Sequence, residues 1–215
     1  MLRLLIQVCP ASPYLNSALR NFIPNHPIEY RMITRDESIE LVKMNVKNKN
    51  LVNHMIGVGA IMKGLAEHFG EDPHLWEAVG ILHDIDYETF GEDFANHGAK
   101  SAEMVKDLLP DDAIKAIRSH NPLTGYNPES KFDISLLAAD AISGLIVANA
   151  LVRPNRMKGM KAKSIKKRMK DKSFARQINR ENVMMCEDIG IQFSEFATIA
   201  IKAMESVADQ IGLGN

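Results

Sequence analysis

Asp140 is an ionisable residue in the middle of an apolar run, ISLLAADAISGLIVANALV over residues 134–152. On a helix, the residues that share its face are apolar or small: Leu136, Leu137, Gly144 and Val147. A carboxylate buried alone is costly enough to take up a proton, whereas an adjacent cation stabilises its charge. A metal ion, a buried Arg or a helix N-terminus would each serve, so Asp140 alone does not identify a site.

His54 shows the same pattern on a helix expected over residues 50–69, where Val58, Ile61 and Leu65 follow at i+4, i+7 and i+11. This spacing predicts that the imidazole points into the core. A single histidine on an apolar face is more often a hydrogen-bonded core residue than a metal ligand. His54 by itself therefore leaves both interpretations open.

The adjacent pair His83 and Asp84 ends an apolar helix expected over residues 73–82 and begins a loop. Neighbouring side chains diverge within a helix, but at a helix end they can converge on one point. An imidazole and a carboxylate together form a mixed nitrogen and oxygen site that suits first-row transition ions. His97 and His120 add two imidazoles, one at the start of an expected helix and one at the end of another.

The ordered set H-x28-HD-x12-H-x22-H-x19-D resembles the signature of the HD-domain superfamily, which comprises helical metal-dependent phosphohydrolases. The dipeptide alone is common, but the whole set, each residue on the expected kind of element, is much more specific. The resemblance covers about residues 41–152. It implies that His54, His83 and Asp140 hold one metal ion.

The resemblance further implies that His97 and His120 hold a second ion and that Asp84 bridges both. The expected cofactor is one or two divalent transition ions (Mn, Fe, Co, Ni or Zn), because imidazole-rich ligation disfavours Mg as the only ion. Such ions lower the pKa of bound water and offset charge on phosphoryl oxygens. The expected activity is hydrolysis of a phosphate mono- or diester, with a nucleotide favoured as the phosphorylated small-molecule substrate.

The expected catalytic residues are His83, Asp84 and Asp86. Many members of the superfamily read H-D-I-G at this point, whereas this chain has Asp86 in place of the glycine. Asp86 and the nearby Glu88 could orient the imidazoles from behind or act as a general acid. The alternative is that both are solvated loop carboxylates.

Two other functions stay open at this level. A helical His/Asp site with two irons can also activate oxygen, and a mixed-valence iron signal would identify that chemistry. A regulatory or nucleic-acid-binding module without turnover could keep the same fold, although every expected metal position is filled in this chain.

A basic segment over residues 153–180 contains twelve Lys or Arg and one acid, Asp171, in a chain whose net charge is −1. Such a segment could attract a polyanionic substrate or bind nucleic acid. The alternative is an exposed basic helix that is balanced by the acidic stretch 71–112. Arg153, which directly follows the apolar run around Asp140, is the expected phosphate-binding residue.

Helical signals run almost throughout the chain from Thr34, and strand patterns are lacking. The sequence therefore predicts an all-α fold, an HD-domain helical bundle of about seven to eight helices. The first is capped by Thr34, and the others are expected over residues 50–69, 73–82, 97–109, 111–120, 133–152, 164–187 and 193–211.

The chain of 215 residues is expected to comprise an N-terminal appendage (1–31), an HD metal-binding core (32–152) and C-terminal helices packed on that core (153–215). Two isolated cysteines, Cys9 and Cys186, indicate no disulfide framework and favour a reducing, cytoplasmic location. Residues 134–152 are long enough to span a bilayer, but Asp140 would cost about 2.5–3.5 kcal/mol there. We therefore expect a core helix and no membrane partner.

Overall fold

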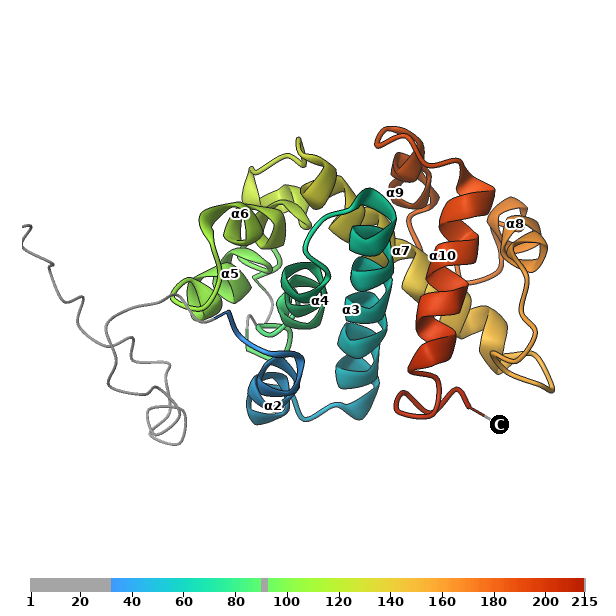
Figure 1. The fold of residues 1–215 in the computed structure, drawn as a ribbon, viewed down its shortest axis with the longest axis horizontal. Coiled ribbons are helices and arrows are strands. Elements are labelled where there is room, and N and C mark those ends of the chain that lie inside the picture. Colours follow the sequence, from blue (N-terminus) through green and yellow to red (C-terminus); the bar gives the residue numbers. More distant parts are fainter. Residues whose placement is uncertain (1–31, 90–92, 215) are drawn as a thin grey trace, which may run out of the picture. The chain divides into compact units, whose positions relative to one another are not determined.

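The computed structural model describes residues 32–89 and 93–214, so the expected appendage over residues 1–31 lies outside the described residues. The described residues form nine α-helices and two short 3-10 helices and contain no strand, which confirms the all-α class (Figure 1). The helices are α2 (Arg35–Asn45), α3 (Lys49–Phe69), α4 (Pro73–Leu82), α5 (Ala99–Val105), α6 (Asp111–Ser119), η1 (Pro122–Thr124), α7 (Lys131–Leu151), α8 (Ala162–Lys170), α9 (Arg180–Met184), η2 (Met185–Glu187) and α10 (Phe193–Ser206).

Local side chains set where the first helices begin and end. Thr34 and Glu37 form the expected capping box at the start of α2, because each side chain accepts a hydrogen bond from the other's backbone N–H. Gly70 ends α3 with a φ of +73°, a left-handed conformation that glycine adopts without strain. Asp72 caps α4, and Pro73 occupies its first turn. The short turn between Gly70 and Asp72 folds α4 back along α3.

Helices α3 and α4 pack so closely that their backbones meet at two glycines. A Cβ atom placed on Gly80 would lie 2.7 Å from the Cα atom of Gly59 and 2.8 Å from its backbone nitrogen. Because α4 ends directly before His83 and Asp84, this contact sets how near those two residues come to His54 on α3. The glycine pair therefore fixes the spacing of two elements that carry the candidate ligands.

We expect Gly80→Ala to lower the free energy of unfolding by about 1–3 kcal/mol, because the added methyl group meets the backbone of α3, which cannot rotate away. Gly57→Ala is the matched control. A Cβ atom there meets the mobile tip of Met204 at 3.2 Å, and the change should be close to neutral. Urea unfolding followed by circular dichroism measures both. Equal stability of the two variants would contradict the close packing of α3 on α4.

Helix α7 is the central helix of the described residues. It packs against α3, α6, α8, α9 and α10, and Figure 1 shows it crossing behind α3 and α10. By length and composition it is the one helix of the described residues that could cross a membrane, and 67% of its most apolar window is buried inside the protein. Burial of this extent agrees with the expected core helix.

The predicted helix over residues 164–187 is wrong, because the structure divides this stretch into α8, α9 and η2. Asp171 ends α8: its carboxylate accepts hydrogen bonds from the backbone N–H groups of Ser173 and Phe174, which competes with helical bonding. The guanidinium group of Arg180 then binds backbone carbonyls of the following turn, including that of Ile178 at 2.7 Å. This division explains why the described residues hold more helices than predicted.

Candidate metal centre

The six candidate ligands come from five helices or from the residues next to them. His54 lies in α3 and Asp140 lies in α7. The other four lie at helix ends: His83 caps the C-terminus of α4 and is followed by Asp84, His97 precedes α5, and His120 caps the C-terminus of α6. Helix ends allow these side chains to turn toward the faces of α3 and α7.

The first set of converging groups consists of His54, His83 and Asp84, whose donor atoms lie within 4.8 Å of one another. Asp140 lies beside them, with its Oδ1 atom 3.0 Å from Nε2 of His54 and 3.9 Å from Nε2 of His83. The side chains of Asp140 and His54 are 34% and 23% exposed, whereas that of His83 is fully buried. The site therefore opens to solvent on the side of Asp140 and His54.

The second set consists of Asp84, His97 and His120, again with donor atoms within 4.8 Å. Oδ1 of Asp84 lies 3.2 Å from Nε2 of both His97 and His120 and 3.3 Å from Nε2 of His83. Its other oxygen, Oδ2, lies 3.8 Å from Nε2 of His54. Asp84 thus belongs to both sets and would contribute a carboxylate oxygen to an ion held by either of them.

Backbone carbonyls fix the orientation of two of the four imidazoles. Nδ1 of His83 lies 2.9 Å from the carbonyl oxygen of Gly80, and Nδ1 of His120 lies 2.6 Å from that of Ile117. A carbonyl oxygen can only accept, so each Nδ1 carries a proton and donates it. In the neutral ring, Nε2 then keeps its lone pair, which faces Asp84.

Side chains orient the other two imidazoles in the same way. Nδ1 of His97 lies 2.8 Å from Oδ1 of Asp86. Nδ1 of His54 lies 3.1 Å from the hydroxyl oxygen of Ser143, which donates its own proton to the backbone carbonyl of Asp140 and therefore accepts from His54. Each Nε2 atom is thereby directed into the cluster, the arrangement found where histidines ligate a metal.

Asp86 lies behind His97 and is fully buried. In addition to the imidazole, it accepts hydrogen bonds from the backbone N–H groups of Gly98 at 2.9 Å and Ser101 at 3.1 Å. With these partners it faces away from the open side of the cluster. We therefore assign Asp86 a positioning role in place of the expected catalytic one, and its burial shows that it is not a solvated loop carboxylate.

Glu88 has a different position and a different partner set. Its side chain is exposed, and it accepts hydrogen bonds from the backbone N–H groups of Lys47 at 2.8 Å and Asn48 at 2.7 Å. These bonds lower the pKa of its carboxyl group. Glu88 ties its loop to the residues that precede α3 and does not reach the cluster.

The cluster holds ionised carboxylates in a buried place. Burial would raise the pKa of Asp84, but the charge of His83 and hydrogen-bonding contacts to His120 and His97 hold that pKa well below its usual range. Burial would likewise lower the pKa of His97, but Asp84 and Asp86 raise it to about 10. The site therefore favours positive charge at its centre, which protons on the imidazoles or a divalent cation can supply.

Two further features fit a cation better than protons. Nε2 of His83 is buried without a hydrogen-bond partner among the described residues. The Nε2 atoms of His97 and His120 lie 3.2 Å from each other and each 3.2 Å from Oδ1 of Asp84. A cation among these atoms would take all of them as ligands, and imidazole nitrogen with carboxylate oxygen suits a divalent transition ion.

Ser143 and Gly98 support the site but were not predicted from the sequence. Ser143 lies three residues after Asp140, and its place in an apolar run was the available signal. Gly98 has a φ of +83°, and a Cβ atom there would lie 2.8 Å from Cε1 of the His120 ring. In the sequence, only the position of Gly98 next to His97 could have indicated this role.

The structure does not bring Arg153 to the cluster. Helix α7 ends at Leu151, eleven residues after Asp140, which corresponds to about 16 Å along the helix axis. The guanidinium group of Arg153 binds the backbone carbonyls of Arg156 and Lys158 in the loop that follows. We therefore do not assign Arg153 a contact with a phosphate at the metal centre.

We expect Asp86→Asn to weaken binding of a divalent ion by about 10–100-fold, because an amide group has one acceptor oxygen and cannot accept both from the N–H groups of Gly98 and Ser101 and from Nδ1 of His97. Glu88→Gln is the matched control, since it removes a nearby carboxylate that does not contact the cluster. Competition with a chelating dye measures the affinity. Equal affinity in the two variants would contradict the role given to Asp86.

The model of the HD domain family matches residues 51–145, a stretch that includes all six clustered residues. A ribonuclease Y of Desulfotalea psychrophila (strain LSv54 / DSM 12343) is 26% identical over 176 residues, which cover 76% of this chain and 32% of that protein. The chain therefore spans about a third of the length of this relative. No solved structure gives a significant match. Residues 51–145 of this chain are an HD domain, and its similarity to ribonuclease Y is that of a distant homologue.

Proposed function

We propose that this chain is a metal-dependent phosphohydrolase that cleaves a phosphate mono- or diester. The observation that carries the proposal is the convergence of four Nε2 atoms on the carboxylate of Asp84, with every Nδ1 atom held from behind. The match of residues 51–145 to the HD domain supports the same conclusion. His54, His83, Asp84 and Asp140 would hold one ion, and Asp84, His97 and His120 a second.

Bound there, divalent ions would lower the pKa of a water molecule and offset the charge that develops on phosphoryl oxygens. Asp84 would keep two ions at a fixed separation, because its carboxylate lies between both sets of imidazoles. His83 and His120 are buried and fixed by backbone carbonyls, so they would keep their orientation through turnover. The substrate would approach from the exposed side of His54 and Asp140.

The proposed substrate class is a nucleotide or a nucleic-acid phosphodiester. The name of the relative, ribonuclease Y, supports a phosphodiester of RNA, although this chain spans only 32% of that protein. The proposed ions are Mn, Fe, Co, Ni or Zn, since imidazole nitrogens make up four of the six ligands.

The test is a turnover screen of the purified chain after loading with each of the five ions separately. The substrates are p-nitrophenyl phosphate as a monoester, bis-p-nitrophenyl phosphate as a diester, nucleoside mono- to triphosphates, cyclic nucleotides and a short RNA. We expect hydrolysis of at least one ester class, which is lost with chelator and restored by the ion. Protein that retains a full complement of ion and hydrolyses none of them would contradict the proposal.

A further inference from the structure

The arginines of the basic segment (residues 153–180) are largely used to hold its own backbone. Arg156 donates to the carbonyl of Gly212 at 3.0 Å, and Arg168 donates to the side chain of Asn149 on α7 at 3.0 Å. Arg153 and Arg180 bind backbone carbonyls of their own turns. Arg156 and Arg168 therefore hold the segment against the rest of the chain, and Arg153 and Arg180 stabilise its turns.

The lysines of the segment behave differently. All seven are exposed, and none forms an ion pair with a carboxylate in residues 32–89 or 93–214. The one acid of the segment, Asp171, accepts hydrogen bonds from Ser173 and Phe174. The lysines are Lys158, Lys161, Lys163, Lys166, Lys167, Lys170 and Lys172. None of the seven ammonium groups is therefore neutralised by a direct ion pair within the described part of the chain.

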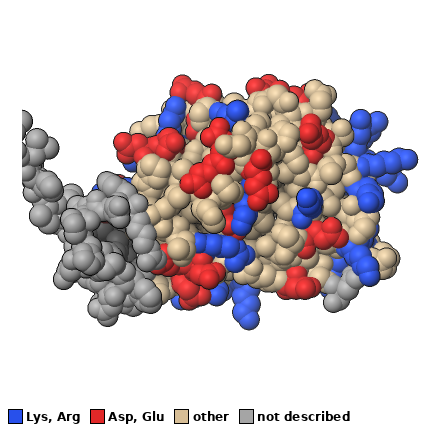
Figure 2. Space-filling model, viewed as in Figure 1, with Lys and Arg blue, Asp and Glu red and all other residues tan. Residues whose placement is uncertain are grey.

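Four of these lysines form a row on one face of α8. Lys163, Lys166, Lys167 and Lys170 follow the spacing i, i+3, i+4 and i+7, which places them side by side over about 10 Å of helix. The opposite face of α8 is anchored by Ile165, which is fully buried. Figure 2 shows blue side chains projecting from the right-hand edge of the molecule, the end at which Figure 1 labels α8.

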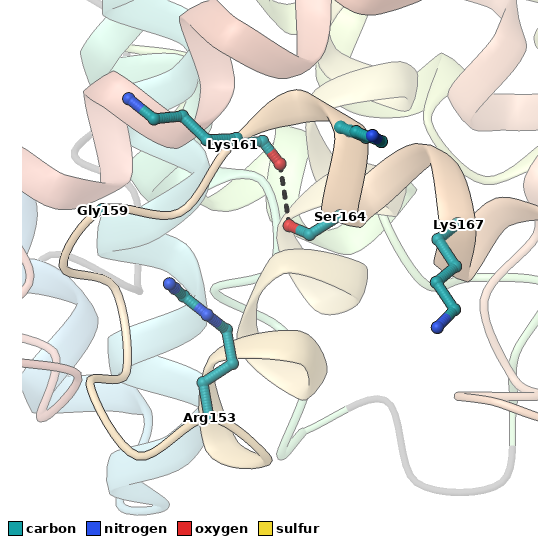
Figure 3. Close-up of a pocket in the computed structure, with 6 residues that line it drawn as sticks. Arg153, Gly159, Lys161, Ser164 and Lys167 are labelled. Carbon is teal, nitrogen blue, oxygen red and sulfur yellow. Dashed lines mark hydrogen bonds between the residues drawn. The ribbon is translucent and has the colours of Figure 1, made fainter.

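A hollow of about 350 Å³ lies beside this row. It is lined by Arg153, Gly159, Lys161, Lys163, Ser164 and Lys167. The hydroxyl group of Ser164 donates a hydrogen bond to the backbone carbonyl of Lys161 at 2.7 Å, and Figure 3 shows both residues together with the cationic side chains of Arg153 and Lys167. The hollow is large enough for a phosphate group and has no carboxylate in its lining, so it extends the positive face of α8.

We propose that the lysine row of α8 and the adjoining hollow bind the phosphate backbone of a nucleic acid. A row of separate charges fits a linear polyanion, in which successive phosphates can meet successive lysines. The single aromatic residue of the segment, Phe174, lies under the guanidinium group of Arg168 at 4.0 Å and offers no free ring for base stacking. Binding should therefore depend on phosphates and be independent of base sequence.

A lipid surface fits this face less well. A helix that lies on a bilayer places apolar side chains into it. In α8, Ile165 is instead fully buried inside the protein and Met169 is half-buried. Leu151 and Val152 are exposed just before the segment, so the experiment below includes a membrane arm.

The far end of the segment also approaches the metal centre, because Ile178 packs against Gly144, one helical turn beyond Asp140.

The test measures fluorescence anisotropy of a labelled 20-nucleotide single-stranded RNA with the full chain, in EDTA, from 50 to 300 mM salt. The variant carries Lys163→Gln, Lys166→Gln, Lys167→Gln and Lys170→Gln. We expect its affinity at 100 mM salt to fall at least about tenfold. The slope of log affinity against log salt should become shallower by roughly 3, since each lost phosphate contact removes about 0.7.

In the matched control, Gln replaces four exposed lysines outside the segment, so the control loses the same amount of charge. These are Lys43, Lys47, Lys49 and Lys106. It should bind RNA as the unchanged chain does. Thermal unfolding of both variants verifies that each is folded. Equal affinity and equal salt slope in the two variants would overturn the proposal, and so would binding to vesicles containing phosphatidylserine without binding to RNA.

The proposal does not rest on the proposed hydrolysis. EDTA keeps the metal centre out of the measurement. Failure of the lysine variant to lose affinity would therefore refute the docking surface alone. Absence of ester hydrolysis would refute the proposed function alone.

Discussion

Asp84→Asn is expected to abolish phosphoester hydrolysis, with a fall in kcat of at least about a thousandfold. The substitution keeps the shape of the side chain but removes the negative charge that both sets of imidazoles share. It also replaces an acceptor oxygen by an amide group, which would direct hydrogen atoms toward the Nε2 atoms in the cluster. We expect loss of bound ion from both sets, measured by elemental analysis of the purified variant alongside its turnover.

The matched control for this prediction is Asp36→Asn, which removes one carboxylate from the first turn of α2. The side chain of Asp36 is 94% exposed, and the residue lies outside the cluster. The control should retain its ions and its turnover. An Asp84→Asn protein that hydrolyses the ester at the unchanged rate would exclude this cluster as the catalytic centre.

Removal of the ion is expected to lower the melting temperature of the chain by about 8–16 °C. An ion present at a thousand times its Kd stabilises the folded state by about 4 kcal/mol, because the unfolded chain does not assemble the site. In a domain of this size each kcal/mol shifts Tm by about 2–4 °C. Differential scanning calorimetry of chelated protein, and of the same protein after reloading, measures the shift.

This shift should be specific to the cluster. Asp84→Asn should show a much smaller rise in Tm on addition of Mn or Zn, whereas Asp36→Asn should show the full rise. If none of the five proposed ions raises the Tm of the unchanged chain, the cluster is stable by protonation alone and the cofactor proposal is wrong.

Much of the fold could be predicted because its signals are local. The capping box of Thr34 and Glu37, the left-handed Gly70 and the Asp72-Pro73 start of α4 each act within one helical turn. The end of α8 could not be predicted as securely. It depends on Asp171 together with Arg180, whose guanidinium group stabilises the turn that follows α8 by binding its carbonyls. From periodicity alone, the predicted helix extended to residue 187, whereas α8 ends at Lys170.

The six residues of the cluster could be proposed from their order and spacing, and the structure brings all six together. What periodicity shows is which face a residue occupies, so His54 and Asp140 were expected to point inward. The role of Asp86 was harder to predict, because it depends on a turn that places this residue behind His97. Contacts between segments distant in sequence, such as Ser143 with His54, have no local signal.

The surroundings of Arg153 could not be predicted from its position in the sequence. It follows α7 directly, but the length of that helix carries it away from Asp140. Its surroundings instead include Lys161, Lys163 and Lys167, residues that the sequence grouped only by charge. The same segment thus contains four arginines that bind oxygen atoms of the chain and seven exposed lysines, a division that composition does not reveal.

The most direct test of the metal centre is a crystal structure of the ion-loaded chain with data collected at the absorption edge of the bound metal. We predict an anomalous peak next to the carboxylate of Asp84, with imidazole Nε2 atoms at about 2.0–2.2 Å from the ion. Occupation of both sets would give two peaks that share Asp84. Ion-loaded crystals with no anomalous peak at these residues, or with a peak only elsewhere on the protein, would contradict the assignment.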